Sequence, residues 1–150
     1  MDDLGSLNPW GNLQGVLRYE LHLPWQTPSN NTIRELHHFA YKKLRQTWCE
    51  AVLAGIGLRK PAAPIERAFL VVIRECEGGG LDWDNVYGGL KPVLDCLVSP
   101  SARNPSGLGL IRDDSPRHMP FPPFVIQKSS KRGLGKTTLL IYELPDTATA

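Results

Sequence analysis

Aspartates at two places in the middle of the chain have the type and spacing of a metal site. Asp82 and Asp84 are separated by one residue, and Asp113 and Asp114 follow further along. Residues at i and i+2 project to the same side of an extended backbone, so Asp82 and Asp84 can converge on one cation, with Asp114 completing the site. Mg²⁺ prefers such carboxylate oxygens and keeps several waters. With Lys91 to neutralise charge on a phosphate, the set predicts metal-dependent phosphodiester hydrolysis by an activated water molecule.

The same residues also fit ordinary local structure. Asp-x-Asp-Asn ahead of a periodic apolar run is typical of a loop that ends in a helix N-cap, which would be Asp84 or Asn85. The string Asp113–Pro116 is likewise a common turn sequence. Each short motif is unspecific by itself. The ordered combination of the blocks favours the metal site.

Four sequence blocks together resemble the RusA family of Holliday-junction resolvases. In chain order they are Leu23–Asn31 (LPWQTPSNN), Asp82–Asn85, Lys91–Leu97 and Asp113–Asp114. The resemblance spans residues 17–144. It implies a homodimeric endodeoxyribonuclease that depends on Mg²⁺, with Mn²⁺ as a candidate substitute, and that resolves four-way DNA junctions by paired symmetric nicking. Two alternatives stay open: a non-catalytic DNA-structure-binding protein on the same fold, and a metal-dependent nuclease that acts on other nucleic acids.

The resemblance also implies roles for individual residues. Asp82, Asp84 and Asp114 match the three metal ligands of the family, and together with Lys91 they match its catalytic residues. One departure concerns the lysine, which follows the Asp-Asn pair closely in the family pattern. Here the residues 86–90 intervene and add about one helical turn of chain. The position of Lys91 therefore rests on the family-like block that follows it.

Further residues near these blocks are expected to support the site. The supporting set is Asn85, Asp95 and Asp113, with Asp113 placed behind Asp114. Asp95 has three interpretations: an extra carboxylate near the metal, a salt-bridge partner of Lys91 at i+4, or a helix-cap contact. His118 is close enough in sequence to Asp114 to support it as well. Trp83 is expected to point away from the two aspartates and to pack in the core.

The formal net charge of +2 means that any nucleic-acid site must be local. Basic residues gather in two stretches outside the acidic blocks. The predicted DNA contacts are Arg34, Lys42, Lys43 and Arg45 in the first half and Lys128, Lys131, Arg132 and Lys136 in the last quarter. The alternative interpretation is a solvated helix face and a charged hairpin tip.

The 150 residues predict one α+β domain over residues 16–144, between a flexible leader (1–15) and a flexible tail (145–150). We expect a small mixed four-stranded sheet with two helices, in the order β-α-β-α-β-β. The predicted strands cover residues 16–23, 65–76, 124–128 and 137–144, and the last two form a hairpin around a turn at 129–135. The predicted helices run from about residue 33 to Gly55 and over residues 86–98.

The sequence predicts a cytoplasmic location and argues against a membrane partner and a nucleotide cofactor. Three cysteines without a metal-like spacing, no basic-then-apolar opening segment and no long apolar run favour a soluble cytoplasmic protein without a membrane partner. The family resemblance implies that the protein is bacterial or phage-encoded. The cysteines are expected to be core residues. The stretch 133–138 looks like the end of a nucleotide-binding P-loop, but strand-forming residues follow it instead of a helix. We therefore expect no nucleotide cofactor.

Overall fold

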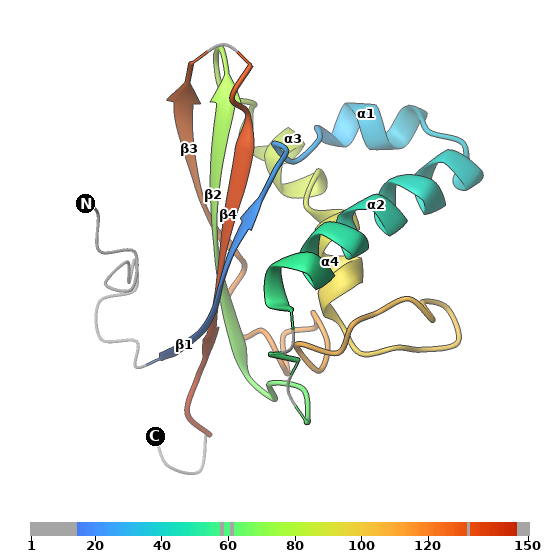
Figure 1. Ribbon diagram of the computed structural model, residues 1–150, viewed down its shortest axis with the longest axis vertical. Helices are drawn as coiled ribbons and strands as arrows, with labels where there is room; N and C mark the ends of the chain where they lie inside the picture. Colours follow the sequence, from blue (N-terminus) through green and yellow to red (C-terminus); the bar gives the residue numbers. More distant parts are fainter. Residues whose placement is uncertain (1–14, 58, 61, 132, 147–150) are drawn as a thin grey trace.

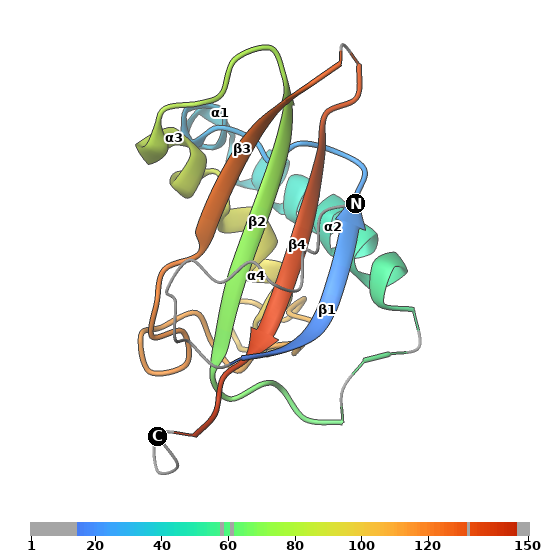
Figure 2. The same cartoon turned by 90° about the vertical axis from the view of Figure 1, so that its left-hand side faces the viewer.

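The computed structural model describes residues 15–57, 59–60, 62–131 and 133–146, and these residues form one four-stranded sheet. The strands are β1 (Val16–Leu23), β2 (Ala68–Glu77), β3 (Phe124–Ser130) and β4 (Lys136–Glu143). Their order across the sheet is β1-β4-β2-β3 (Figures 1 and 2). Strand β4 pairs antiparallel with β1 and β2, and β2 pairs parallel with β3. The predicted α+β class with a mixed four-stranded sheet is confirmed, whereas the predicted leader and most of the predicted tail lie outside the described residues.

The predicted hairpin of the last two strands is wrong. Strands β3 and β4 are consecutive in the chain, but β2 lies between them. Strand β2 is buried along almost its whole length, as expected for a central strand with apolar residues on both faces. A central strand needs two neighbours, and β3 and β4 supply them. The stretch 131–135 therefore joins two strands across the end of β2, and its basic residues do not form a hairpin tip.

Each predicted helix is present but broken into two. The first consists of α1 (Asn30–Glu35) and α2 (His38–Ile56), because Leu36 and His37 are extended and the His37 side chain caps the new helix by accepting a hydrogen bond from the Phe39 amide. The second consists of α3 (Trp83–Gly88) and α4 (Lys91–Leu97). Two glycines and Pro92 weaken helix continuity at that break.

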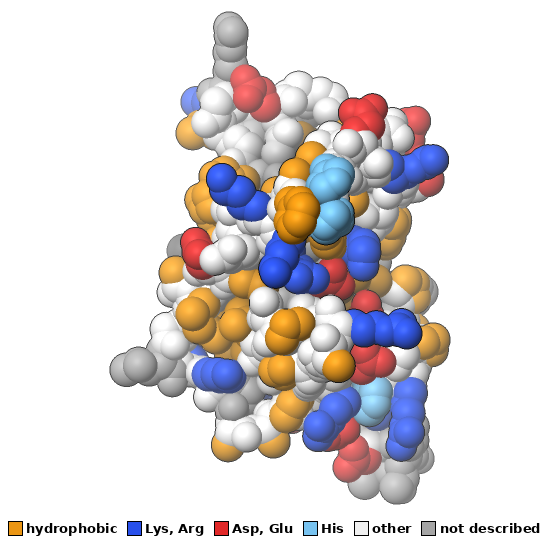
Figure 3. All heavy atoms as spheres, turned by 90° about the vertical axis from the view of Figure 1, so that its right-hand side faces the viewer, with side chains coloured by type: hydrophobic (Ala, Val, Ile, Leu, Met, Phe, Trp, Pro, Cys, Tyr) orange, Lys and Arg blue, Asp and Glu red, His pale blue; other side chains and the backbone are white. Residues whose placement is uncertain are grey.

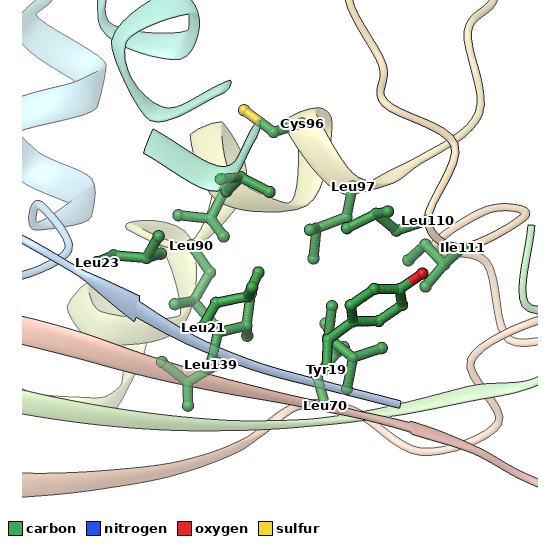
Figure 4. Close-up of a cluster of buried hydrophobic side chains, with 14 of the residues drawn as sticks. Tyr19, Leu21, Leu23, Leu70, Leu90, Cys96, Leu97, Leu110, Ile111 and Leu139 are labelled. Atoms are coloured by element: carbon green, nitrogen blue, oxygen red, sulfur yellow. The ribbon is translucent and has the colours of Figure 1, made fainter. Parts of the chain in front are cut away.

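The helices cover one face of the sheet (Figures 1 and 2), and the main core lies between them. Leu21, Leu70 and Leu139 point from the strands toward Leu90 and Leu97 (Figure 4), and all five are almost fully buried. A second apolar cluster lies on the other face of the sheet. Its buried members are Phe69, Val71, Ile73, Leu140, Tyr142 and Leu144. The sheet is therefore a two-sided scaffold, and it fixes the chain segments that leave the ends of β2.

The cysteines belong to this core, as predicted. Cys49, Cys76 and Cys96 are buried free thiols. The Cys49 and Cys96 sulfur atoms lie 2.6 Å apart and join α2 to α4. Among the helices of the described residues, none has the length and apolar character needed to cross a membrane.

Candidate active site

The acidic block at residues 82–85 forms the start of helix α3. Asp82 is the N-cap residue with an extended backbone (φ −58°, ψ 150°), and Trp83 and Asp84 lie in the first helical turn. The expectation of an extended Asp-Trp-Asp segment is therefore wrong. Its basis was the alternation of side chains along a strand, and in a helix residues two apart point about 200° from each other. Side-chain alternation along an extended strand therefore does not bring the Asp82 and Asp84 carboxylates together, because Trp83 and Asp84 are helical.

The Asp82 and Asp84 carboxylates are nevertheless available for an external cation. Both residues are exposed, and Asp82 makes no capping hydrogen bond although it occupies the N-cap position. An aspartate at this position usually accepts a bond from a free backbone amide of the helix. Neither carboxylate has a hydrogen-bond or ion-pair partner among the residues that the structure describes. Local capping, which was the alternative interpretation of this block, does not account for them.

Helix α3 is held in place by the Leu23–Asn31 block of the motif. The Asn85 side-chain oxygen accepts a hydrogen bond from the Asn31 amide (3.2 Å). A Cβ atom at Gly88 would lie 2.5 Å from Cγ of Asn30, and one at Gly89 would lie 1.7 Å from the carbonyl oxygen of Pro28. Only glycine permits such close approach at these two positions. Asn85 therefore ties the two motif blocks together, and its predicted supporting role at a metal site stays a prediction.

A row of polar side chains on the sheet anchors the segment that leads to α1 and the segment that leads to α3. Thr137, Arg74 and Gln127 are cross-strand neighbours on β4, β2 and β3. The Arg74 guanidinium, which is 3% exposed, donates to the Thr27 carbonyl (3.0 Å), and the Thr137 hydroxyl donates to a carbonyl two residues earlier in the same segment (2.8 Å). The Gln127 amide accepts from the Leu81 N–H (2.8 Å) and donates to the Leu81 carbonyl (2.9 Å). Asp82 thus follows a residue that is fixed to the sheet.

Lys91 and Asp95 form a pair on helix α4. Lys91 Nζ lies 3.5 Å from Oδ2 of Asp95, which confirms the interpretation of Asp95 as a salt-bridge partner at i+4. The Tyr41 hydroxyl of α2 donates to the same oxygen (2.7 Å), and Lys91 Nζ lies 5.9 Å from the centre of the Tyr41 ring. The Lys91 side chain is 61% exposed. An exposed pair of this kind contributes little stability, so the ammonium group can leave Asp95 for a phosphate.

The Tyr41 hydroxyl gives this cluster a pH dependence. Burial, and next the hydrogen bond to Asp95, raise the Tyr41 pKa above its usual value of 10.0. Because the Tyr41 pKa is higher in the folded protein than in the unfolded chain, the contribution of this hydroxyl to stability is fully present below pH 10. That contribution is lost as the pH rises above 10, because only the unfolded chain releases the proton there. We expect the free energy of unfolding to fall more steeply between pH 9 and about pH 11 in the wild type than in Tyr41→Phe. Urea unfolding of both proteins across this range measures the slopes, and equal slopes would contradict the prediction.

Asp113 and Asp114 lie in the loop that follows Ile111. A hydrogen bond with Ser115 lowers the Asp113 pKa, whereas desolvation and then the charge of Asp113 raise the Asp114 pKa. Asp95 acts on Asp114 in the same direction. The fold therefore brings Asp95, Asp113 and Asp114 within electrostatic range, and a bound cation would relieve their repulsion. Asp113 lies beside Asp114 as expected.

His118 and Trp83 do not have the positions that were expected for them. His118 Nδ1 lies 2.8 Å from the carbonyl oxygen of Glu66, so its hydrogen bond is directed to Glu66 and not to Asp114. Trp83 is not a core residue: it is 57% exposed and its ring centre lies 6.4 Å from that of Tyr87. The extended backbone assumed for this block would have turned Trp83 inward, and its position in the first turn of α3 turns it outward.

The three predicted metal ligands are not assembled into one group. Within the described ranges, no group of three or more His, Cys, Asp or Glu side chains is placed to hold a metal ion. Asp82 and Asp84 belong to α3, and Asp114 belongs to a separate loop. The donor chemistry fits Mg²⁺, because all three ligands are carboxylates and two of them have no partner in this part of the chain. Magnesium binding at these residues stays a prediction.

The predicted DNA contacts fall into two groups. Arg34 lies in the last turn of α1, and Lys42, Lys43 and Arg45 lie on α2, where Arg45 is half-buried and the others are exposed. The second group lies around the connection of β3 to β4. There Lys128 and Lys131 are exposed, Lys136 Nζ lies 3.6 Å from Oε2 of Glu75, and Arg132 lies outside the described residues. The alternative of a solvated helix face stays open for the first group.

Sequence reasoning missed two features of the structure. Tyr41 was not singled out, although it contacts both Lys91 and Asp95; an i+4 ion pair on a short helix offers no hint of a partner on another helix. The exposed aromatic residues at the junction of α1 and α2 were missed as well. Their sequence, His37-His38-Phe39, was a visible signal, but burial had to be known before it could be interpreted.

A scan against protein-family models finds no match, and no curated protein is significantly similar to the chain. The resemblance to the RusA family therefore rests on the four motif blocks, and the structure adds the contact between the first two of them.

Proposed function

We propose that the chain is a Mg²⁺-dependent endodeoxyribonuclease of the RusA type, which resolves four-way DNA junctions by paired symmetric nicking. One observation carries the proposal: Asp82 and Asp84 are exposed carboxylates without a partner in the described part of the chain, on a helix that the Leu23–Asn31 block holds in place. A structure that fixes the backbone of two aspartates and leaves their oxygens unbonded is suited to bind an external cation.

The proposed roles follow from the family resemblance. Asp82, Asp84 and Asp114 would hold Mg²⁺, which supplies charge neutralisation at a phosphodiester and activation of water when bound. Lys91 would stabilise negative charge that builds on the phosphate. Asp95 and Tyr41 hold the Lys91 ammonium group at the start of α4 until a phosphate competes for it. Asp113 and Asp95 place negative charge around Asp114. This charge raises the Asp114 pKa and would favour the binding of a cation there.

The proposal includes a homodimer. A four-way junction has two strands to be cut at symmetric positions, and a two-fold enzyme presents two identical sites to a two-fold substrate. The family resemblance, and not a surface of the described residues, supports this part of the proposal.

A second candidate is a non-catalytic protein that binds branched DNA on the same fold. It is favoured by the absence of a preassembled group of three metal-binding side chains within the described ranges. The basic residues of α1 and α2 would then carry the function, and the acidic residues would be structural. A metal-dependent nuclease with another nucleic-acid substrate is the third candidate, since the carboxylates do not define the substrate.

Cleavage of a labelled synthetic four-way junction, compared with cleavage of a linear DNA duplex and of an RNA of matched sequence, tests the three candidates. We expect paired nicks in the junction with Mg²⁺, none with a chelator, and none in the duplex. Junction binding without any cleavage would support the non-catalytic candidate. Equal cleavage of junction, duplex and RNA would support a general nuclease, and neither binding nor cleavage would reject the proposal.

A further inference from the structure

Three aromatic rings gather at the surface where α1 gives way to α2. The ring centres of His37 and His38 lie 4.3 Å apart, those of His38 and Phe39 lie 4.1 Å apart, and the planes of His37 and Phe39 are close to parallel at 28°. We call these three residues the ring cluster. Figure 3 shows adjacent histidine side chains beside hydrophobic ones on this face, with Lys and Arg side chains close by.

Core packing does not account for the ring cluster. Phe39 is 70% exposed, which is more than any other exposed large hydrophobic residue of the described part. Its neighbours His37 and His38 are exposed as well. His37 has a structural role, because its ring nitrogen Nδ1 accepts a hydrogen bond from the Phe39 amide at the start of α2. That bond fixes the backbone at the junction, so the Phe39 ring is presented from a rigid support.

The surroundings of the ring cluster are basic. Lys42 and Lys43 follow Phe39 by three and four residues on α2 and therefore lie on its side of the helix. Arg34 lies in the last turn of α1. Over residues 34–45 the chain has four Arg or Lys residues and one acidic residue, Glu35. An apolar patch that only binds the apolar surface of another protein would not require this positive charge.

Exposed aromatic rings among cations are what a protein uses to bind single-stranded or unstacked nucleic acid. The cations contact phosphates, and the rings stack on bases whose faces are open. In a continuous duplex both faces of each base are covered by neighbouring base pairs, whereas bases at a branch point lose a stacking neighbour when the arms separate and expose one face. A second protein copy would instead place its own apolar residues on Phe39, and its Lys and Arg would repel the same cations.

We propose that the ring cluster is a binding site for unstacked nucleobases at the branch point of branched DNA, with Phe39 as the stacking residue and Lys42 and Lys43 as phosphate contacts. The inference rests on the proposed function and adds to it a structure-selective contact outside the acidic residues. Under this inference the residues where α1 ends and α2 begins make the protein prefer branched DNA to linear DNA.

Binding measurements in chelator separate this inference from the question of cleavage. The probes are a four-way junction with 2-aminopurine in place of an adenine next to the branch point, and a linear duplex with 2-aminopurine in the same sequence. The variants are Phe39→Ala, which removes the ring, and Phe39→Tyr, which keeps one. Leu53→Ala is the matched control, because Leu53 is another exposed apolar residue of α2 (47%) and lies away from the ring cluster. Circular dichroism melting of each protein checks that the fold is intact.

We expect Phe39→Ala to weaken junction binding about tenfold and to remove the quenching of 2-aminopurine, with duplex binding nearly unchanged. Phe39→Tyr and Leu53→Ala should bind as the wild type does. Wild-type affinity of Phe39→Ala for the junction, or an equal loss for junction and duplex, would overturn the inference. A change of oligomeric state in Phe39→Ala with unchanged junction affinity would also overturn it and identify a protein contact. If the wild type binds neither probe, the proposed function itself fails.

Discussion

The Asp84→Asn protein is expected to bind a four-way junction as the wild type does and to cleave it at least about a thousandfold more slowly. Asparagine has nearly the same shape as aspartate but lacks the negative charge that a divalent cation needs. Asp84 is exposed and makes no hydrogen bond or ion pair within the described residues, so the change removes no internal contact. Unchanged thermal stability would accompany the loss. Single-turnover cleavage and gel-shift binding with Mg²⁺ measure both quantities.

Glu35→Gln is the matched control for this experiment. Glu35 ends α1, which packs beside α3, and it is exposed. The substitution removes one negative charge near the site without touching a proposed ligand. It should leave cleavage within about twofold of the wild type, since an exposed charge at a distance is largely screened. If Asp84→Asn cleaves at the wild-type rate, the assignment of Asp84 as a metal ligand is wrong. If both variants lose activity alike, overall charge and not a metal site accounts for the effect.

The Gly89→Ala protein is expected to lose about 3 kcal/mol of folding stability, seen as a fall of about 10 °C in the midpoint of thermal unfolding. Gly89 has an ordinary helical backbone (φ −71°, ψ −10°), so alanine meets no conformational obstacle there. The added methyl group would lie 1.7 Å from the carbonyl oxygen of Pro28, which is backbone and can move only with its whole segment. Calorimetry or circular dichroism melting measures the effect. Cleavage should fall as well, because α3 carries Asp82 and Asp84.

Gly79→Ala provides the comparison. A Cβ atom at Gly79 would meet no atom within 4 Å, and its φ lies outside the positive range that disfavours L residues. The same chemical change should therefore alter stability by less than about 0.5 kcal/mol. Equal stability of Gly89→Ala and Gly79→Ala would show that Pro28 does not pack against Gly89 in solution. The structural account of the contact between the first two motif blocks would then have to be abandoned.

The periodicity of the sequence predicted the strands well, but it did not predict their partners. Residues 16–23 alternate cleanly, and β1 has the predicted bounds. The order of the sheet was missed, because alternation reports which side of a strand is buried and says little about its neighbours. The run of β2 held part of the information: apolar residues on both faces indicate a central strand with two neighbours, but they do not identify those neighbours as β3 and β4.

The candidate site was predictable as a set of residues and less so as a geometry. The Lys91–Asp95 pair followed from i+4 spacing, which helix geometry fixes locally. Asp82 and Asp84 were assigned to an extended segment, but the backbone turns helical at Trp83, three residues before the predicted start of the helix at residue 86. The contact of Pro28 with Gly89 joins residues far apart in the chain, so no local pattern could show it. The exposure of Phe39 likewise depends on how two helices meet, which a single periodic run does not reveal.

The parallel pairing of β2 and β3 has a consequence for how the chemistry is encoded. Parallel neighbours require a crossover, and here that crossover, residues 78–123, contains both short helices α3 and α4 and every acidic residue of the candidate site together with Lys91. The predicted DNA contacts and the ring cluster lie outside it. In the proposed function, separate stretches of the chain therefore supply the residues for cleavage and the residues for DNA binding. Under this proposal the crossover can change in length or sequence without altering the strands and helices that carry the predicted DNA contacts.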